Sequence, residues 1–147
     1  MDDISERKLL SNLLDSQRVI YSRARYQSGS GDVSFSGWIP FNTIETNIGG
    51  GSWSNGAYIV PVDGLYILNF TCYSNNMTSG RIAVQNLNRG EMSMCNQNNT
   101  TSLTAIYYCY AGDRLVAGPY ASNYTISFYS AAGHNSFTIA RLPGGTI

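Results

Sequence analysis

Short apolar segments separated by turn-forming residues recur along most of the chain, and this pattern constrains the fold more than any other feature. Eight segments are predicted to be strands: residues 19–25, 56–60, 65–74, 81–87, 103–110, 114–117, 124–130 and 136–142. Turn signals separate several of them, for example Pro61–Gly64, Asn88–Gly90 and Ala111–Asp113. Many short strands at this spacing predict an all-β sandwich or barrel. The 147 residues suffice for one such domain with a single core.

Two of the predicted strands are apolar or aromatic on both faces. A strand with one face in water normally alternates apolar and polar residues, but Leu65–Phe70 and Ala105–Tyr110 do not. In a single sandwich one apolar face of each strand would be exposed, and such faces usually mark interfaces. The sequence therefore predicts that the domain associates with copies of itself.

The first 25 residues differ from the rest because they carry nine of the eighteen charged residues. We predict a short helix over residues 1–18, followed by the β domain over residues 19–147. Four positions keep the 3-4 spacing of a coiled-coil seam: Leu10, Leu13, Gln17 and Ile20. A helix of this length is marginal alone in water, so it is expected to pack on other copies or on the β domain, with a frayed tail as the alternative.

Charge and composition exclude several classes of partner. The net charge is zero, so no overall field attracts nucleic acid or an anionic membrane. No apolar run approaches the roughly 20 residues of a membrane-spanning helix. Few charges and many neutral polar residues are typical of extracellular surfaces, which predicts a secreted protein. The start Met1-Asp2-Asp3 is not a signal peptide, so we expect that the signal was removed or that the protein leaves the cell another way, as a virion protein does.

The three cysteines, Cys72, Cys95 and Cys109, are an odd number, which argues against a complete framework of disulfides within the chain. Cys72 and Cys109 are the one pair worth considering, because both lie in predicted strands that could be neighbours. The preferred interpretation is three small buried hydrophobic residues.

No catalytic grouping is evident, and the protein is predicted not to be an enzyme. His134 is the only histidine, and no cysteines stand at the spacing that a zinc site needs. Acidic residues are scattered singly, so the sequence shows neither a catalytic carboxylate pair nor the oxygen cluster that calcium prefers. We expect no cofactor, and calcium is the one ion left open.

The order of several motifs resembles the globular head domain of complement component 1q, a branch of the tumour-necrosis-factor-like jelly rolls. The resemblance covers about residues 19–147. The motifs that carry it are Pro61-Val62-Asp63-Gly64-Leu65-Tyr66, Ala111-Gly112-Asp113 and Ser136-Phe137. The segments Ile20–Arg25 and Thr46–Gly50 look closest to soluble, lectin-like members from molluscs. The chain departs from the family pattern at Ile139, where a glycine is usual, and over 121–130, which is longer and more aromatic.

This resemblance implies a ten-stranded jelly-roll sandwich that forms a homotrimer, is secreted and has no catalytic activity. Many of the molluscan members are lectins of innate immunity. The family fold also implies that both termini lie at the base of the domain. Three loops would then lie at the opposite apex: residues 75–80, 96–102 and 131–135.

The apical loops supply the predicted ligand-binding residues. They are Arg81, Asn96, Gln97, Asn98, Asn99, Tyr129 and His134. Amides donate and accept hydrogen bonds at once, which suits the vicinal hydroxyls of a sugar. Arg81 could bind a sugar carboxylate such as that of sialic acid in a bidentate contact. Tyr73, Tyr129 or Trp53 could pack against the C–H face of the sugar.

Three classes of binding function follow. The leading hypothesis is a soluble, lectin-like pattern-recognition protein that binds glycans or glycoproteins on cell or microbial surfaces through a trimeric head. The alternatives are a viral or phage fibre head that binds a receptor, and a cytokine-like ligand of a protein receptor. A short helix before the β domain favours the lectin, because a fibre head is expected to continue from a longer shaft.

Overall fold

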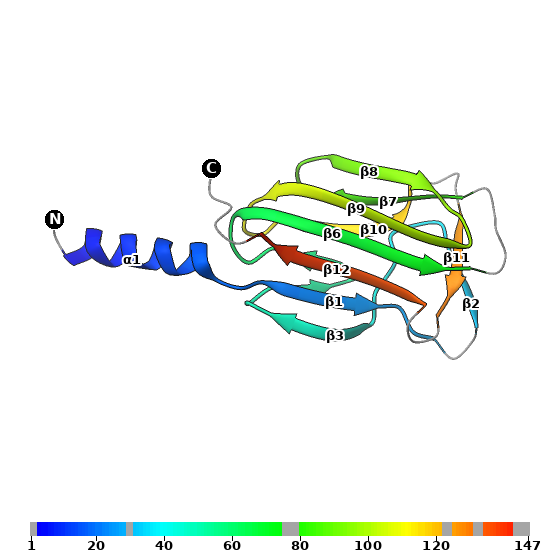
Figure 1. Cartoon of the computed structure of the whole chain (residues 1–147), viewed down its shortest axis with the longest axis horizontal. Coiled ribbons are helices and arrows are strands. Elements are labelled where there is room, and N and C mark those ends of the chain that lie inside the picture. The colour runs from blue at the N-terminus through cyan, green and yellow to red at the C-terminus, as the bar shows by residue number, and fades with distance from the viewer. Residues whose placement is uncertain (1–2, 29–30, 75–79, 122–124, 131–133, 143–147) are drawn as a thin grey trace.

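A computed structural model shows a two-sheet β sandwich preceded by one helix (Figure 1). The structure describes residues 3–28, 31–74, 80–121, 125–130 and 134–142. Within these residues the elements are α1 (Asp3–Gln17), β1 (Tyr21–Arg25), β2 (Asp32–Phe35), β3 (Thr43–Ile48), β4 (Ser52–Ser54), β5 (Ala57–Ile59), β6 (Gly64–Tyr73), β7 (Arg81–Asn86), β8 (Glu91–Asn96), β9 (Thr100–Cys109), β10 (Arg114–Pro119), β11 (Ile126–Tyr129) and β12 (Asn135–Arg141).

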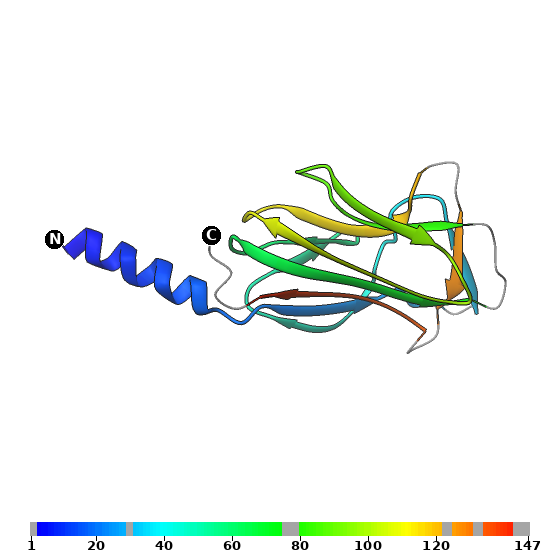
Figure 2. The same cartoon turned by 45° about the horizontal axis from the view of Figure 1, so that its top comes forward.

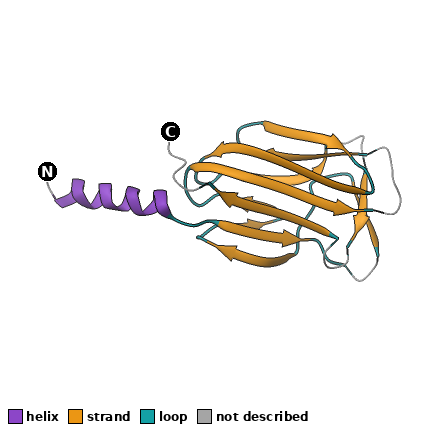
Figure 3. Cartoon of the chain, in the orientation of Figure 1, coloured by secondary structure: helices purple, strands orange, loops and turns teal. Residues whose placement is uncertain are grey.

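The strands form two five-stranded sheets and a separate two-stranded ribbon. The first sheet has the order β3-β1-β12-β6-β9, the second sheet has the order β4-β5-β10-β7-β8, and β11 pairs with β2. Figure 3 shows this mainly β architecture with its single N-terminal helix. The prediction of an all-β jelly-roll sandwich preceded by a helix is confirmed, and its ten strands are those of the two main sheets.

Alternating side chains of the central strands fill the space between the sheets. In β6, residues Tyr66, Leu68 and Phe70 are fully buried, whereas the residues between them are half-buried on the outer face. Ile82 and Leu115 of the second sheet are buried in the same core. Full burial of such a side chain contributes about 1.5–3 kcal/mol to folding. The strict alternation of β6 therefore fixes which of its faces turns inward.

Four of the observed strands were not predicted from the sequence: β2, β3, β4 and β8. Each has only one strand neighbour, because β3, β4 and β8 are edge strands and β2 pairs only with β11. β2, β3 and β4 contain no fully buried residue, and neither does β8. Since these four strands bury little surface, they lack the hydrophobic periodicity from which strands are recognised. The aromatic segment over 121–130 is explained by β11, which forms the extra ribbon with β2.

The sandwich has a base and an apex. The helix α1, the start of β1 and the end of β12 lie at one end, which we call the base (Figure 1). The ribbon of β2 and β11 lies at the other end, which we call the apex. Strand β6 runs from the base at Gly64 to the apex at Tyr73, and β9 returns to the base at Cys109.

The helix projects away from the sandwich at the base, as Figure 2 shows from a second direction. It ends at Gln17, so the predicted seam does not extend to Ile20, which is 1% exposed and belongs to the β core. The strand predicted over residues 19–25 begins only at Tyr21, because Val19 precedes β1 and is 70% exposed. The leucine side chains of α1 do not pack on the β domain, since Leu9, Leu10, Leu13 and Leu14 are 55–59% exposed.

Arg141 of β12 joins the helix to the β domain. Its guanidinium donates hydrogen bonds to the carbonyl oxygen of Asp15, in the last turn of α1, and to that of Asp63 at 2.8 Å. The last four carbonyls of a helix have no partner within it, and a cation there also interacts favourably with the helix dipole. Arg141 therefore caps α1 from a residue far away in sequence.

Gly64 makes room for this arginine. A Cβ atom at Gly64 would lie 2.5 Å from Nε of Arg141. The φ of Gly64 is 158°, which is close to extended backbone, so the close approach of Arg141 is the main reason for glycine here. The next ring, Tyr66, is buried, and its hydroxyl donates to the carbonyl oxygen of Val62 at 2.7 Å.

We expect Arg141→Met to loosen the helix and weaken the fold. The substitution removes two charge-assisted hydrogen bonds, and the Asp15 carbonyl then keeps only the N–H of Arg18 as a donor. This should cost about 2–3 kcal/mol of unfolding free energy. Urea denaturation and the helical signal in circular dichroism measure the two effects. Arg114→Met, which changes an exposed arginine of β10, is the control. Equal stability of the two variants would contradict the capping role.

The structure excludes a Cys72–Cys109 disulfide. Cys72 lies opposite Thr101 in the β6–β9 ladder, and Cys109 lies eight residues further along β9, opposite Gly64. At the rise of a strand this separation is roughly 26 Å, whereas a disulfide needs Cα atoms within about 7 Å. All three cysteines are free thiols, and Cys72 and Cys109 are buried as expected, although Cys95 is only partly so.

Candidate functional site

Three aromatic rings gather at the apex, and we call Tyr73, Tyr129 and His134 the apical cluster. The rings of Tyr73 and Tyr129 stack with their centroids 5.4 Å apart at an interplanar angle of 21°. The His134 ring lies 5.4 Å from Tyr73 and 5.7 Å from Tyr129. All three side chains are half-buried. The structure thus brings together two of the predicted site residues, Tyr129 and His134, with Tyr73.

Strand pairing holds these three rings in place. Tyr73 is the last residue of β6, and its backbone N–H donates to the carbonyl oxygen of His134 at 2.8 Å. Tyr129 is the last residue of β11 and pairs with Asp32 of β2. Asn135, directly after the histidine, donates through its side-chain amide to the carbonyl oxygen of Tyr129 at 3.1 Å. The cluster therefore stands on rigid strand ends.

An exposed amide turn lies beside the apical cluster. Tyr73 pairs with Thr100 across the β6–β9 ladder, and the next N–H, that of Ser74, donates to the carbonyl oxygen of Asn99 at 2.7 Å. The hydroxyl of Thr101 accepts from the N–H of Asn98 at 2.8 Å and closes the turn. The side chains of Asn98 and Asn99 are exposed. They are free to meet a ligand from solvent at the edge of the aromatic surface.

The predicted loop over 96–102 is shorter than expected. Strand β8 extends to Asn96 and β9 begins at Thr100, so only residues 97–99 connect them. Gln97 is 4% exposed, and its amide donates to the carbonyl oxygen of Ser127. Gln97 therefore links two parts of the fold, and its amide N–H is used within the chain.

Arg81 and Asn96 form a second group on the side of the second sheet. They are directly opposite each other in the β7–β8 ladder. Asn96 is exposed and Arg81 is half-buried. The apical cluster stands at the ends of β6 and β11 and directly before β12, whereas Arg81 and Asn96 belong to β7 and β8. Residues 75–79 and 131–133, which were expected to form the other two apical loops, lie outside the described residues.

Trp53, which was expected to offer a ligand face, packs against other aromatic rings of the fold. Its ring packs against Tyr58 at 5.3 Å and Phe137 at 5.9 Å, and its Nε1–H donates to the hydroxyl of Ser22 at 2.8 Å. Sequence analysis instead missed Trp38 and Tyr120, which line a small cleft of about 220 Å³ at the apical end of β10. The close approach of Trp38 to β10 explains the glycine at position 118, since a Cβ at Gly118 would lie 3.0 Å from Trp38.

The outer face of the first sheet carries an apolar row near the base. Five side chains adjoin one another across all five strands: Ile48, Tyr21, Ala140, Ile67 and Ile106. Ile48 is 50% and Ile106 is 56% exposed. Leu65 and Tyr108, which are also paired, extend this surface toward the base. We call these seven residues the apolar band; they confirm that β6 and β9 present apolar side chains on both faces.

The next row toward the apex is polar. Arg23 of β1 makes an ion pair with Glu45 at 3.5 Å. Asn69 donates to the hydroxyl of Thr104 at 2.9 Å and to that of Ser102 at 3.0 Å. Most of these groups have a polar partner in the chain, so the apolar band is the part of this face that gains most from being covered.

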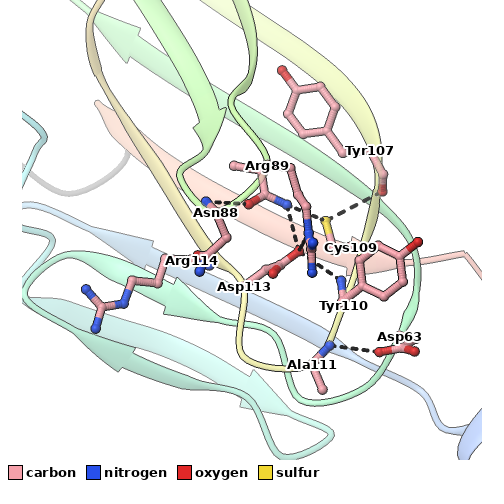
Figure 4. A network of polar contacts seen from close by, with 10 residues as sticks. Asp63, Asn88, Arg89, Tyr107, Cys109, Tyr110, Ala111, Asp113 and Arg114 are labelled. Atoms are coloured by element: carbon pink, nitrogen blue, oxygen red, sulfur yellow. Dashed lines mark hydrogen bonds and ion pairs between the residues drawn. The ribbon is translucent and has the colours of Figure 1, made fainter.

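A buried carboxylate ties two turns together at the base (Figure 4). Asp113 is 2% exposed. Its Oδ2 atom accepts hydrogen bonds from Asn86 at 3.0 Å, from the backbone of Tyr110 at 2.9 Å and from Arg89 at 3.1 Å. The guanidinium of Arg89 also stacks over the Tyr110 ring at 4.3 Å. Burial alone would raise the pKa of Asp113, but these three hydrogen bonds and the charge of Arg89 hold it below its usual value.

The thiols are not activated for nucleophilic chemistry. Burial raises the pKa of Cys72 to about 12, and the neighbouring Cys95 adds to the effect. Burial also raises the pKa of Cys109 to about 12, with a further contribution from the charge of Asp113. A thiol with such a pKa is protonated at neutral pH, and the thiolate is the nucleophile.

Among the described residues, no three His, Cys, Asp or Glu side chains gather as metal ligands would. Over the same part of the chain, no helix is long and apolar enough to cross a membrane.

Comparisons with known proteins show the fold. The chain matches no protein-family model and no curated protein. Solved structures with a similar fold include Eiger TNF from S. frugiperda, with a TM-score of 0.64 and 14% identity over 88% of this chain and 96% of that one. Murine APRIL has a TM-score of 0.60 and 15% identity, over 85% and 100% of the two chains. The PRD1 vertex protein P5 has a TM-score of 0.56 and 13% identity, over 86% and 97%. The fold is therefore a tumour-necrosis-factor-like jelly roll.

Proposed function

We propose that this protein is a secreted, lectin-like recognition protein, and that its apical cluster binds the sugar units of glycans on cell or microbial surfaces. The observation that carries the proposal is the half-buried group of Tyr73, Tyr129 and His134 beside the exposed amides of Asn98 and Asn99. Aromatic rings offer a flat apolar face with a polar edge. Amides both donate and accept hydrogen bonds. Together they match a sugar, which has one C–H face and a rim of hydroxyls.

We further propose that the protein acts as a homotrimer held together by the outer face of the first sheet. The apolar band supports self-association, because an exposed surface of this kind is typical of an interface. The number three comes from the resemblance of the sequence to complement component 1q heads. Three linked apical clusters would raise a weak affinity for one sugar through effective concentration.

A protein-receptor ligand is the second candidate function. It is favoured by the fold shared with Eiger TNF and APRIL, whereas the shared fold of a phage vertex protein favours an attachment role. Fold likeness alone does not decide among these functions. The apical cluster favours the lectin, because a sugar site is expected to show clustered aromatic and amide groups at one spot.

The direct test is a glycan array with purified protein whose mass is measured by light scattering. We expect binding to a defined set of glycans, and Tyr129→Ala and Tyr73→Ala should each weaken it on the order of tenfold or more. Tyr120→Ala, which changes an exposed tyrosine of the Trp38 cleft, is the matched control. If only Tyr120→Ala lost binding, the ligand site would be that cleft and not the apical cluster. If a verified trimer bound no glycan, the lectin proposal would be refuted.

A further inference from the structure

The helix α1 presents a face of leucines to solvent. At 100° per residue, Leu9, Leu10, Leu13 and Leu14 fall within an arc of about 140°. Their side chains are 55–59% exposed. A lone helix of 15 residues is marginal in water and is normally stabilised by packing of its apolar face. The β domain does not provide that packing, because the helix projects away from it (Figures 1 and 2).

The attachment of the helix is confined to its last turns. Arg141 bonds to the carbonyl oxygen of Asp15, and Arg18 makes an ion pair with the Asp15 side chain at 2.6 Å. Asn12 and Ser16 line a cleft of about 490 Å³ together with Tyr108 of the β domain. The two contacts of Asp15 hold the direction of the helix and leave its leucine face uncovered.

Exposed apolar residues continue from the helix onto the sandwich. Val19, between α1 and β1, is 70% exposed. Two residues later, Tyr21 begins the apolar band, whose member Tyr108 also lines the cleft beside α1. Copies that associate through the apolar band would therefore bring their helices together at the base.

We infer that the leucine face of α1 packs against the same face of α1 in the other copies, so that the helices form a parallel bundle below the heads. This inference rests on the proposed self-association through the apolar band. The width of the leucine face suits a bundle better than a two-helix seam, which needs only a narrow stripe.

The charge of α1 favours this partner over a membrane surface. The helix carries three acidic residues, Asp3, Glu6 and Asp15, and two basic residues, Arg7 and Lys8. Its net charge is therefore −1, from two positive and three negative side chains. Helices that bind anionic membranes have a strongly basic polar face, which α1 lacks.

Cross-linking of the full chain tests the contact. In a Cys95→Ser background, Glu6→Cys places a thiol on the line of the leucines, one turn earlier in the helix. We expect mild oxidation to give covalent dimers of Glu6→Cys at low protein concentration. Lys8→Cys, on the opposite side of the helix, is the matched control and should stay uncoupled. Equal coupling of both variants, or of neither, would overturn the inference.

Sedimentation equilibrium of Leu10→Ser/Leu13→Ser gives a second measurement. We expect the concentration at which the trimer dissociates to rise on the order of 100-fold. The substitutions remove leucine side chains that would be buried between the helices of the bundle. An unchanged dissociation in a trimeric protein would refute the helix bundle and leave the proposed trimer standing. A wild-type monomer would refute the trimer itself, and the bundle with it. Vesicle binding that this variant abolishes would identify a membrane as the partner and overturn the inference.

Discussion

Replacing Asp113 by alanine should destabilise the fold by about 3 kcal/mol at neutral pH. The substitution leaves the Asn86 amide and the Tyr110 N–H without their acceptor in a site where Asp113 itself is 2% exposed. An unsatisfied buried donor costs about 1–3 kcal/mol, and more is lost where the acceptor was charged. The turn between β9 and β10 and the turn between β7 and β8 should loosen together, since Asp113 links them (Figure 4).

The pH dependence of the Asp113 contribution has a definite sign. The pKa of Asp113 is lower in the folded protein than its ordinary value of 3.8. The unfolded chain therefore binds the proton more readily, so the stabilisation is present above that value and is lost as the pH falls through the folded pKa. The difference in unfolding free energy between the wild type and Asp113→Asn should shrink below about pH 4.

Chemical denaturation at several pH values measures this difference. Glu45→Gln is a suitable control, because Glu45 is a partly exposed carboxylate in ion pairs with Arg23 and Arg25. Surface ion pairs contribute little, so its effect should stay below about 1 kcal/mol at every pH. A pH-independent loss in Asp113→Asn would contradict the role assigned to the ionised carboxylate.

Ile106→Asp should convert the proposed trimer into monomers. Ile106 lies opposite Ile67 in the apolar band and is 56% exposed in the single chain. In the trimer, the new carboxylates would be buried without partners, at a cost of about 3–5 kcal/mol for each such charge. The monomer itself should keep its stability, since the side chain already faces solvent there.

Light scattering and thermal unfolding at matched concentration separate these two effects. Leu87→Asp is the control, because Leu87 is 40% exposed in the turn between β7 and β8, outside the apolar band. We expect Leu87→Asp to keep the mass of the wild type. If Ile106→Asp remained a trimer, the apolar band would not be the interface.

Local sequence pattern predicted the strands that bury a face. At each end, β6, β7, β9 and β12 lie within three residues of the predicted ranges. Buried and less buried side chains alternate along most of these strands. This alternation can be recognised from residues that are close together in the sequence. The strands β3 and β8 were missed for the same reason, since neither buries a residue fully and no such alternation marks them.

The candidate site was predicted only in part. Tyr129 and His134 were identified from their residue types, but their contact with Tyr73 depends on the pairing of β6, β11 and β12 with other strands. Gln97 carries an amide of the kind that can bind a ligand. In the fold, this amide donates to the carbonyl oxygen of Ser127, thirty residues away. Trp38 and Tyr120 carried no local signal that they share a cleft.

The two ends of the chain also separate what the sequence determined from what the tertiary structure decided. The concentration of charge before residue 26, followed by alternating apolar residues, determined by sequence alone that a helix precedes a β domain. Only the tertiary structure decided that Ile20 belongs to the core, that Arg141 caps the helix and that Cys72 and Cys109 lie at opposite ends of one ladder. Periodicity and turn chemistry act between near neighbours, whereas register and burial are set by contacts between distant segments.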